Sequence, residues 1–240
     1  MSTTSNSTIL ALDAAAGACS AALWAGGAIA QRRWEAMERG HAEALMPMAR
    51  DVVADTGFQG LDLVAVSVGP GGYTGLRIAI AAARGLGLAL GVPVMGVGSL
   101  DVHRYIARND GVTGPMGVLL ETKRADLYFQ AFGSGDDPLM EPSVASGAEV
   151  EERLVSLADL SNGAATLVGD AVERFVAQAT HHLPDQLVTR IQAADAAAVA
   201  ALAASAFAES GGADISPPRP MYLRAPDTSP PAADRQRLRG

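Results

Sequence analysis

The sequence predicts an α/β protein, and three features of its 240 residues lead to that prediction. Short apolar segments typical of strands lie at 8–13, 19–24 and 28–35. A unit of strand, glycine-rich turn, helix and strand follows at 61–97. Helical and strand-like segments then alternate along the second half of the chain. Three strands followed by alternating helices and strands are typical of the α/β class.

The first elements are predicted by apolar patterning and by the residues that end them. The strands 8–13 and 19–24 are joined by the short segment AAAGA, as in a β-hairpin, and 28–35 is expected to be a third strand. Residues 40–56 carry apolar side chains at helical spacing and stop at Gly57, a residue type that commonly follows a helix.

The unit at 61–97 has the clearest boundaries. Residues 61–68 form a short apolar run typical of a buried strand, and the glycines and proline at 69–72 end it. Thr74 is the expected N-cap of a helix over 76–90, because its hydroxyl can accept a hydrogen bond from a backbone N–H of the first turn. The next strand is expected at 92–97.

The second half is predicted in less detail. The expected elements are a helix at 99–108, strands at 115–120 and 125–132, helices at 150–160 and 170–180 around a strand at 165–168, and an alanine-rich helix at 195–210. The proline-rich segment that follows is expected to lie extended on the surface as far as Leu223. A glycine-rich link at 109–114 divides the chain into 1–108 and 109–223, with a disordered tail at 224–240.

Composition excludes several classes of function. A net charge of -8 and a pI near 4.9 argue against a nucleic-acid binder that acts alone, and the cluster Arg235, Arg237 and Arg239 is interpreted as a solvated end. The single cysteine, Cys19, excludes a disulfide framework within the chain. The N-terminus does not resemble a secretory signal, and charges, glycines and a proline interrupt the apolar stretch 76–97, so we expect a cytoplasmic protein outside the membrane.

The glycine-rich turn is a candidate anion site. Such a turn at a helix N-terminus can bind a phosphate or an acyl-adenylate, although no Gly-Lys-Ser/Thr follows it as in a Walker loop. The alternative is a tight turn without a ligand, which the sequence favours. The residues of a vestigial anion or nucleotide loop are Asp13, Gly71, Gly72, Thr74 and Gly75.

The segment GPGGYTGLRIAIAAARGLGLALGVPVMGVGSL resembles the signature of the TsaB (YeaZ) family of tRNA threonylcarbamoyladenosine biosynthesis proteins. That family usually has Gly-Pro-Gly-Ser-Phe-Thr-Gly-Leu-Arg here, so Gly72 and Tyr73 depart from it. ILALDAAAGACSAALW at 9–24 and GHAEALMPM at 40–48 are similar to its first hairpin and helix. LLETKRADLYFQAF and RPMYLRAP match weaker family patterns in the second half.

The resemblance implies a two-lobed fold of the actin, sugar kinase and Hsp70 (ASKHA) type with a degenerate nucleotide site. The sequence itself shows no internal repeat that would establish two lobes independently. The implied role is that of a non-catalytic scaffold that binds and activates TsaD, the subunit that transfers threonylcarbamoyl to adenosine 37 of ANN-decoding tRNAs. The implied partners are TsaD and the ATPase TsaE, with a homodimer when the chain is alone and tRNA bound only through the complex, and no cofactor is implied.

Two positions where relatives carry active-site groups are altered. The turn after Asp13 consists of Ala14, Ala15 and Ala16, whose methyl groups cannot donate hydrogen bonds to phosphate oxygens, so Asp13 is interpreted as a turn-capping acid and not as a magnesium ligand. The catalytic relatives carry two histidines at i and i+4 on a helix. Here His41 is followed by a leucine at that spacing, so we predict neither a metal site nor catalytic residues.

The helices 41–56 and 76–90 are candidate partner surfaces. The second is apolar on nearly all sides and has a stripe of small residues, so it needs covering on two faces. Each helix can be covered either by this chain's own core or by a partner, and the residues alone favour neither possibility. The resemblance favours a partner, since TsaB proteins pair with TsaD through these helices, and implicates His41, Leu45, Met46, Ala49, Val53, Ala81, Gly85, Leu86 and Ala89.

The alternative function is an enzyme of the same fold that acts alone, either kinase-like or peptidase-like. The alanines after Asp13 and the lone histidine at position 41 argue against it. Tight, magnesium-dependent ATP binding by the isolated chain would favour it.

Overall fold

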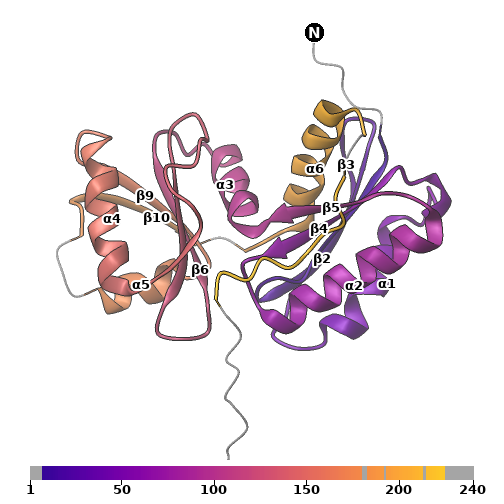
Figure 1. The fold of residues 1–240 in the computed structure, drawn as a ribbon, viewed down its shortest axis with the longest axis horizontal. Helices are drawn as coiled ribbons and strands as arrows, with labels where there is room; N and C mark the ends of the chain where they lie inside the picture. Colours follow the sequence, from indigo (N-terminus) through magenta and orange to yellow (C-terminus); the bar gives the residue numbers. More distant parts are fainter. Residues whose placement is uncertain (1–6, 180–182, 192, 213–214, 225–240) are drawn as a thin grey trace, which may run out of the picture.

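The computed structural model describes residues 7–179, 183–191, 193–212 and 215–224 (Figure 1). Within them the predicted α/β class is confirmed, because two five-stranded mixed sheets each carry helices on both faces. Apart from residue 224, the expected disordered tail lies outside the described residues.

The first sheet has the order β3-β2-β1-β4-β5, with β1 to β3 antiparallel and β1, β4 and β5 parallel. Its apolar strand β4 is buried on both faces, as expected of a parallel strand between helix layers. The elements of this half are β1 (Ile9–Asp13), β2 (Ala18–Ala25), β3 (Ala28–Ala36), α1 (His41–Val52), η1 (Phe58–Gly60), β4 (Leu63–Gly69), α2 (Tyr73–Leu90), β5 (Val94–Gly98) and α3 (Ser99–Asn109).

The second sheet has the order β8-β7-β6-β9-β10, with β6 to β8 antiparallel and β6, β9 and β10 parallel. Its elements are β6 (Met116–Glu121), β7 (Leu127–Phe132), β8 (Ser143–Ala145), α4 (Gly147–Asp159), β9 (Ala164–Gly169), α5 (Val172–Gln178), β10 (Gln186–Ile191) and α6 (Ala196–Ser210). The two halves therefore repeat one βββαβαβα pattern in the same strand order. The sequence did not show this duplication because different apolar residues fill the equivalent strands.

The last helix of each half packs across to the other half. α1 and α2 cover the outer face of the first sheet, and α6 covers its inner face. α4 and α5 cover the outer face of the second sheet, and α3 covers its inner face. α3 and α6 thus lie between the sheets and contact each other (Figure 1).

This exchange changes the expected division at residues 1–108 and 109–223. The alanine-rich α6 brings small side chains against the first sheet, where they bury Ile9 and Leu63 with them. We therefore define the first lobe as the first sheet with α1, α2 and α6, and the second lobe as the second sheet with α3, α4 and α5. We propose this division into two lobes in place of the division into residues 1–108 and 109–223.

Several local expectations need correction. α2 begins at Tyr73 with Gly72 as its N-cap and no capping side chain, so the prediction of Thr74 as N-cap is wrong. The helix predicted at 40–56 is shorter, and the strands β8 and β10 were not predicted. The extended segment before Leu223 is confirmed for the described residues from 215 on, which have no helix or strand. In the part of the chain that the structure describes, no helix is long and apolar enough to cross a membrane.

Candidate interlobe site and helix faces

A cavity of about 1140 Å³ lies between the two lobes. The first lobe lines it with residues 14–17, with 38–43 at the start of α1, and with the glycine-rich turn. The second lobe lines it with residues 120–124, where β6 ends. The cavity is therefore bordered by the ends of corresponding strands of the two halves.

Asp13 ends β1 and is 1% exposed. One carboxylate oxygen accepts the N–H of Ala15 at 3.1 Å, and the other accepts the hydroxyl of Ser67. The predicted turn-capping role of Asp13 is confirmed by the first of these bonds. Burial raises the pKa of this carboxyl, and the bonds from Ser67 and Ala15 oppose that shift. Ala14, Ala15 and Ala16 line the cavity next to Asp13, whereas Asp13 itself does not. At this point the cavity wall therefore consists of methyl groups and contains no carboxylate.

The glycine-rich turn packs directly on this alanine turn. A Cβ on Gly75 would lie 1.9 Å from the carbonyl oxygen of Ala14, and one on Gly71 would lie 2.4 Å from that of Ala15. The N–H of Gly72 donates to the same Ala15 oxygen at 2.7 Å. The close approach of two backbones explains these glycines without a ligand, and so favours the tight-turn interpretation of the motif.

His41 is the first residue of α1 and lines the cavity. Its Nε2 atom is buried without a hydrogen-bond partner. Leu45, where a second histidine would be needed, is 1% exposed and packs in the core of the first lobe. Among the described residues, no group of three or more His, Cys, Asp or Glu side chains is arranged to hold a metal ion.

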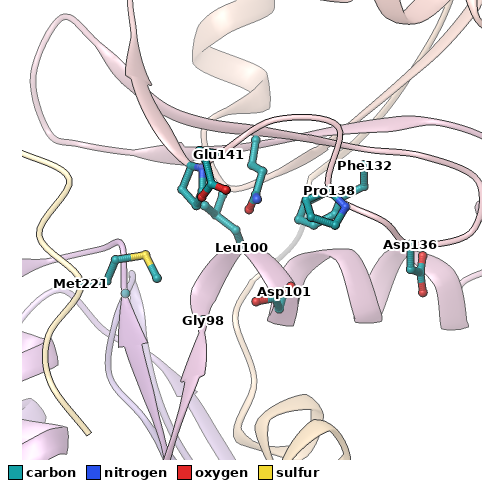
Figure 2. A pocket seen from close by; sticks show the side chains of 11 residues that line it. Gly98, Leu100, Asp101, Phe132, Asp136, Pro138, Glu141 and Met221 are labelled. Carbon is teal, nitrogen blue, oxygen red and sulfur yellow. The ribbon is translucent and has the colours of Figure 1, made fainter.

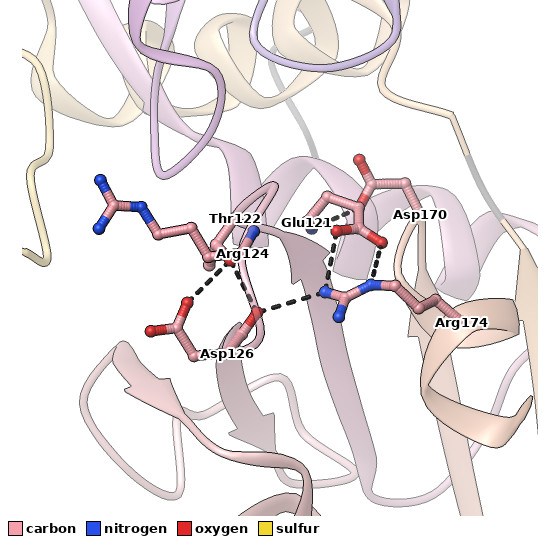
Figure 3. Close-up of polar contacts among 6 residues, drawn as sticks. All are labelled: Glu121, Thr122, Arg124, Asp126, Asp170 and Arg174. Carbon is pink, nitrogen blue, oxygen red and sulfur yellow. Dashed lines mark hydrogen bonds and ion pairs between the residues drawn. The ribbon is translucent and has the colours of Figure 1, made fainter. Parts of the chain in front are cut away.

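The second-lobe wall carries a polar cluster that the sequence analysis missed (Figure 3). The guanidinium of Arg174 donates to both carboxylate oxygens of Glu121 at 2.7 and 2.9 Å. Asp170 accepts the N–H of Glu121 at 2.9 Å, and Thr122 donates to the carboxylate of Asp126 at 2.8 Å. Burial, with Glu121 nearby, raises the pKa of Asp170 to about 6. The duplicated topology was the missing signal, because β6 and β9 end where β1 and β4 end in the other half.

A smaller cavity of about 250 Å³ lies between the start of α3 and the loop after β7 (Figure 2). Its carboxylates come from Asp101, Asp136 and Glu141. Asp136 forms ion pairs with Arg104 at 2.5 Å and with Arg108 at 2.6 Å. These pairs join α3 to the loop after β7 within the second lobe.

The stripe of small residues on α2 faces outward. Ala81, Gly85 and Ala89 are exposed, and Leu88 beside them is 88% exposed. Leu86 is partly buried against the core of the first lobe. The outer face of α2 thus combines these apolar and small residues with the exposed side chains of Arg77 and Arg84, and Leu86 contributes little to it.

The expected partner residues of α1 are mostly inaccessible. Leu45, Ala49 and Val53 are 0–2% exposed and pack in the core of the first lobe, which corrects their assignment to a contact surface. They lie on the side of the helix that faces the sheet. Met46, at 37% exposure, is the large apolar residue of α1 that remains accessible.

Two copies of one five-stranded unit with a cavity between them define a two-lobed ASKHA protein. The family model described as "TsaD: tRNA N6-adenosine threonylcarbamoyltransferase" matches residues 34–228. A solved structure named YeaZ, from Pseudomonas aeruginosa, superimposes with a TM-score of 0.76 at 26% identity, covering 90% of this chain and 100% of that one. The chain belongs to the TsaB/YeaZ family.

Two sequence relatives support this placement. The Escherichia coli protein named "tRNA threonylcarbamoyladenosine biosynthesis protein TsaB" is 33% identical over 127 residues, which cover 52% of this chain and 54% of that protein. The match therefore spans about half the length of that relative. A Mycobacterium tuberculosis protein of unassigned function, Rv3421c, is 31% identical over 195 residues, covering 80% of this chain and 79% of that protein.

Proposed function

We propose that this chain is a non-catalytic scaffold in the synthesis of threonylcarbamoyladenosine at position 37 of ANN-decoding tRNAs, where it binds and activates TsaD in the cytoplasm. The observation that carries the proposal is the outer face of α2, where Leu88 is 88% exposed beside small residues. An exposed leucine next to glycine and alanine favours close contact with another helix. Met46 is a second exposed apolar residue, on the neighbouring helix α1.

The interlobe site supports the non-catalytic part of the proposal. The carboxylate of Asp13 already accepts two hydrogen bonds from its own chain. The glycine turn lies against the alanine turn, where its Gly72 N–H donates to a backbone oxygen. His41 has no second histidine at Leu45. The Asp13 carboxylate and the Gly72 N–H are therefore already engaged, and the histidine that would act with His41 is replaced by Leu45.

The other proposed partners are a second copy of this chain, TsaE and tRNA. An apolar helix face left uncovered in the isolated chain favours a homodimer that TsaD displaces. The ATPase TsaE and the tRNA would join only once TsaD is bound. Light scattering of the isolated chain, with and without TsaD, tests whether the two assemblies are mutually exclusive.

The direct test is co-purification with TsaD, followed by reconstitution of threonylcarbamoyladenosine formation. Leu88→Asp is expected to abolish both, because a carboxylate would be buried unpaired in the contact. Val155→Asp is the matched control, since Val155 is 47% exposed on α4 of the other lobe. Equal complex formation by wild type and Leu88→Asp would show that α2 is not the contact surface.

The alternative function is a self-sufficient enzyme, and the cavity of about 1140 Å³ with the elevated pKa of Asp170 is the observation that favours it. Calorimetric titration with magnesium and ATP separates the two functions. We expect no saturable heat. Tight binding that requires magnesium and is lost in Asp170→Asn would favour the enzyme.

A further inference from the structure

The C-terminal segment 215–224 crosses from one lobe to the other (Figure 1). It has no helix or strand of its own, and it runs beside the first sheet before it reaches the mouth of the cavity. Three of its residues, Met221, Tyr222 and Arg224, line the large cavity. Met221 also lines the small cavity (Figure 2), so the segment contributes to the walls of both cavities.

Met221 and Tyr222 attach this segment to the first lobe. The backbone N–H of Met221 donates to the carbonyl of Val68 in β4 at 2.7 Å. The ring of Tyr222 stacks on that of Tyr73 with centroids 5.7 Å apart. Arg77 lies over the Tyr73 ring at 4.0 Å and donates its Nε–H to the Tyr222 hydroxyl at 2.9 Å. Tyr73 and Arg77, the two partners of Tyr222, both belong to the first turns of α2.

An ion pair attaches the segment to the second lobe. Arg224 forms an ion pair with Asp126, which lies just before β7. Thr122 donates to both the carboxylate and the carbonyl oxygen of Asp126, and Arg174 also donates to that carbonyl. Asp126, the partner of Arg224, thus accepts three hydrogen bonds within the polar cluster of Figure 3.

We propose that residues 215–224 are an interlobe latch that sets how far the cavity opens. The stacked tyrosine holds the segment on α2, and the ion pair joins it to the opposite wall. The side chains of Arg224 and Asp126 are 31% and 26% exposed, so salt screens their attraction. The latch can therefore release from the second lobe while Tyr222 stays in place. This inference does not depend on the proposed function.

The test measures the distance between lobes in the full chain. Nitroxide labels on Asp55→Cys, just after α1, and Asp159→Cys, at the end of α4, are placed in a Cys19→Ala background, because both sites are exposed. Pulsed electron paramagnetic resonance then gives the distance distribution. Arg224→Gln is expected to broaden it toward longer distances, and Asp126→Asn to have the same effect. High salt is expected to broaden the wild-type distribution and to leave Arg224→Gln unchanged.

The control variant is Arg190→Gln, the same substitution at an exposed position on β10. It is expected to leave the distances unchanged, and the exchanged pair Arg224→Asp with Asp126→Arg is expected to restore the narrow distribution. If Arg224→Gln and Asp126→Asn both match the control, the segment does not join the lobes and the latch is refuted. Hydrogen exchange of residues 120–128 gives a second measurement, and unchanged protection in Arg224→Gln would refute it as well. Complex formation with TsaD is not used in either experiment.

Discussion

Ser67 donates its hydroxyl to a carboxylate that is almost fully buried, that of Asp13. Removing the donor leaves this acceptor unsatisfied, so we expect Ser67→Ala to lower the free energy of unfolding by about 1–3 kcal/mol. Urea unfolding at neutral pH measures it. In an Asp13→Asn background, Ser67→Ala should lower the free energy of unfolding by less, because a neutral amide loses less than a carboxylate when a hydrogen-bond donor is removed. Equal costs in the two backgrounds would refute the coupling.

Gly75 and Gly85 lie on the same helix but have different surroundings. A Cβ at Gly75 meets the backbone of Ala14, whereas one at Gly85 meets nothing within 4 Å. We expect Gly75→Ala to destabilise the chain by at least about 2 kcal/mol. Gly85→Ala should stabilise it by about 0.5–1 kcal/mol, because alanine favours a helix interior. Thermal melting of both variants decides this, and similar melting temperatures would contradict it.

Asp170 makes stability depend on pH. Its folded-state pKa of about 6 lies above the ordinary value of 3.8, mainly because burial raises it. The negative charge of Glu121 raises this pKa further, whereas the hydrogen bond from the Glu121 N–H and the charge of Arg174 lower it. The folded chain therefore binds this proton more tightly than the unfolded chain, and the associated stability is lost as pH rises from about 4 through 6. Asp170→Asn keeps an acceptor for the Glu121 N–H and removes the charge.

We expect Asp170→Asn to raise the free energy of unfolding at pH 7.5 by about 1–3 kcal/mol, and by much less at pH 4.5. Denaturant unfolding at both pH values measures the gain. Asp159→Asn, at an exposed site, is the control and should change little at either pH. A gain of the same size at both pH values would show that the carboxyl is not titrating between them.

Residue roles were predictable where they are local in sequence. Asp13 and Ala15 are two residues apart, so the turn cap followed from the pattern around them. Ser67 is 54 residues from Asp13, and Glu121 is 53 from Arg174, so no local pattern connects either pair. Such partners are brought together only by the sheet order.

At the scale of elements, the exposed and buried sides of α2 separate two substitutions. Leu86 packs against the core of the first lobe, while Leu88 is almost fully exposed. We expect Leu86→Asp to lower the melting temperature by several degrees, because a charge enters an apolar contact. Leu88→Asp should melt as the wild type does. A lower melting temperature for Leu88→Asp than for Leu86→Asp would show that Leu88, and not Leu86, faces the core.

The elements differ in how far sequence reveals them. The unit at 61–97 was predicted as strand, turn, helix and strand because its strands are apolar and glycines punctuate it. The N-cap was misplaced, since α2 starts on backbone contacts with the alanine turn and needs no capping hydroxyl. β8 has three residues, and three of the six residues of β10 are polar, so neither shows a clear apolar run.

At the scale of the whole molecule, the sequence predicted the fold class but neither the duplication nor the exchange of helices between the lobes. The α/β class followed from the order of elements, but the exchange of α3 and α6 between lobes depends on which sheet face each helix covers. Ala196 to Ala204 is alanine-rich, and that composition predicts a helix without specifying its sheet. Because α3 and α6 each pack on the sheet of the other half, both halves of the sequence contribute to the contacts between the lobes. The large cavity lies between the lobes that these contacts join.

The charge of the whole molecule limits its contact with nucleic acid. With 26 acidic and 18 basic residues, the isolated chain is expected to bind tRNA weakly or not at all at physiological salt, because binding requires clustered cations that displace counterions. The basic residues Arg235, Arg237 and Arg239 are the cluster found in the sequence. Deleting 227–240 should therefore remove whatever affinity exists. Fluorescence anisotropy with labelled tRNA over a salt series measures this, and micromolar binding that survives the deletion would require a basic surface on the folded lobes.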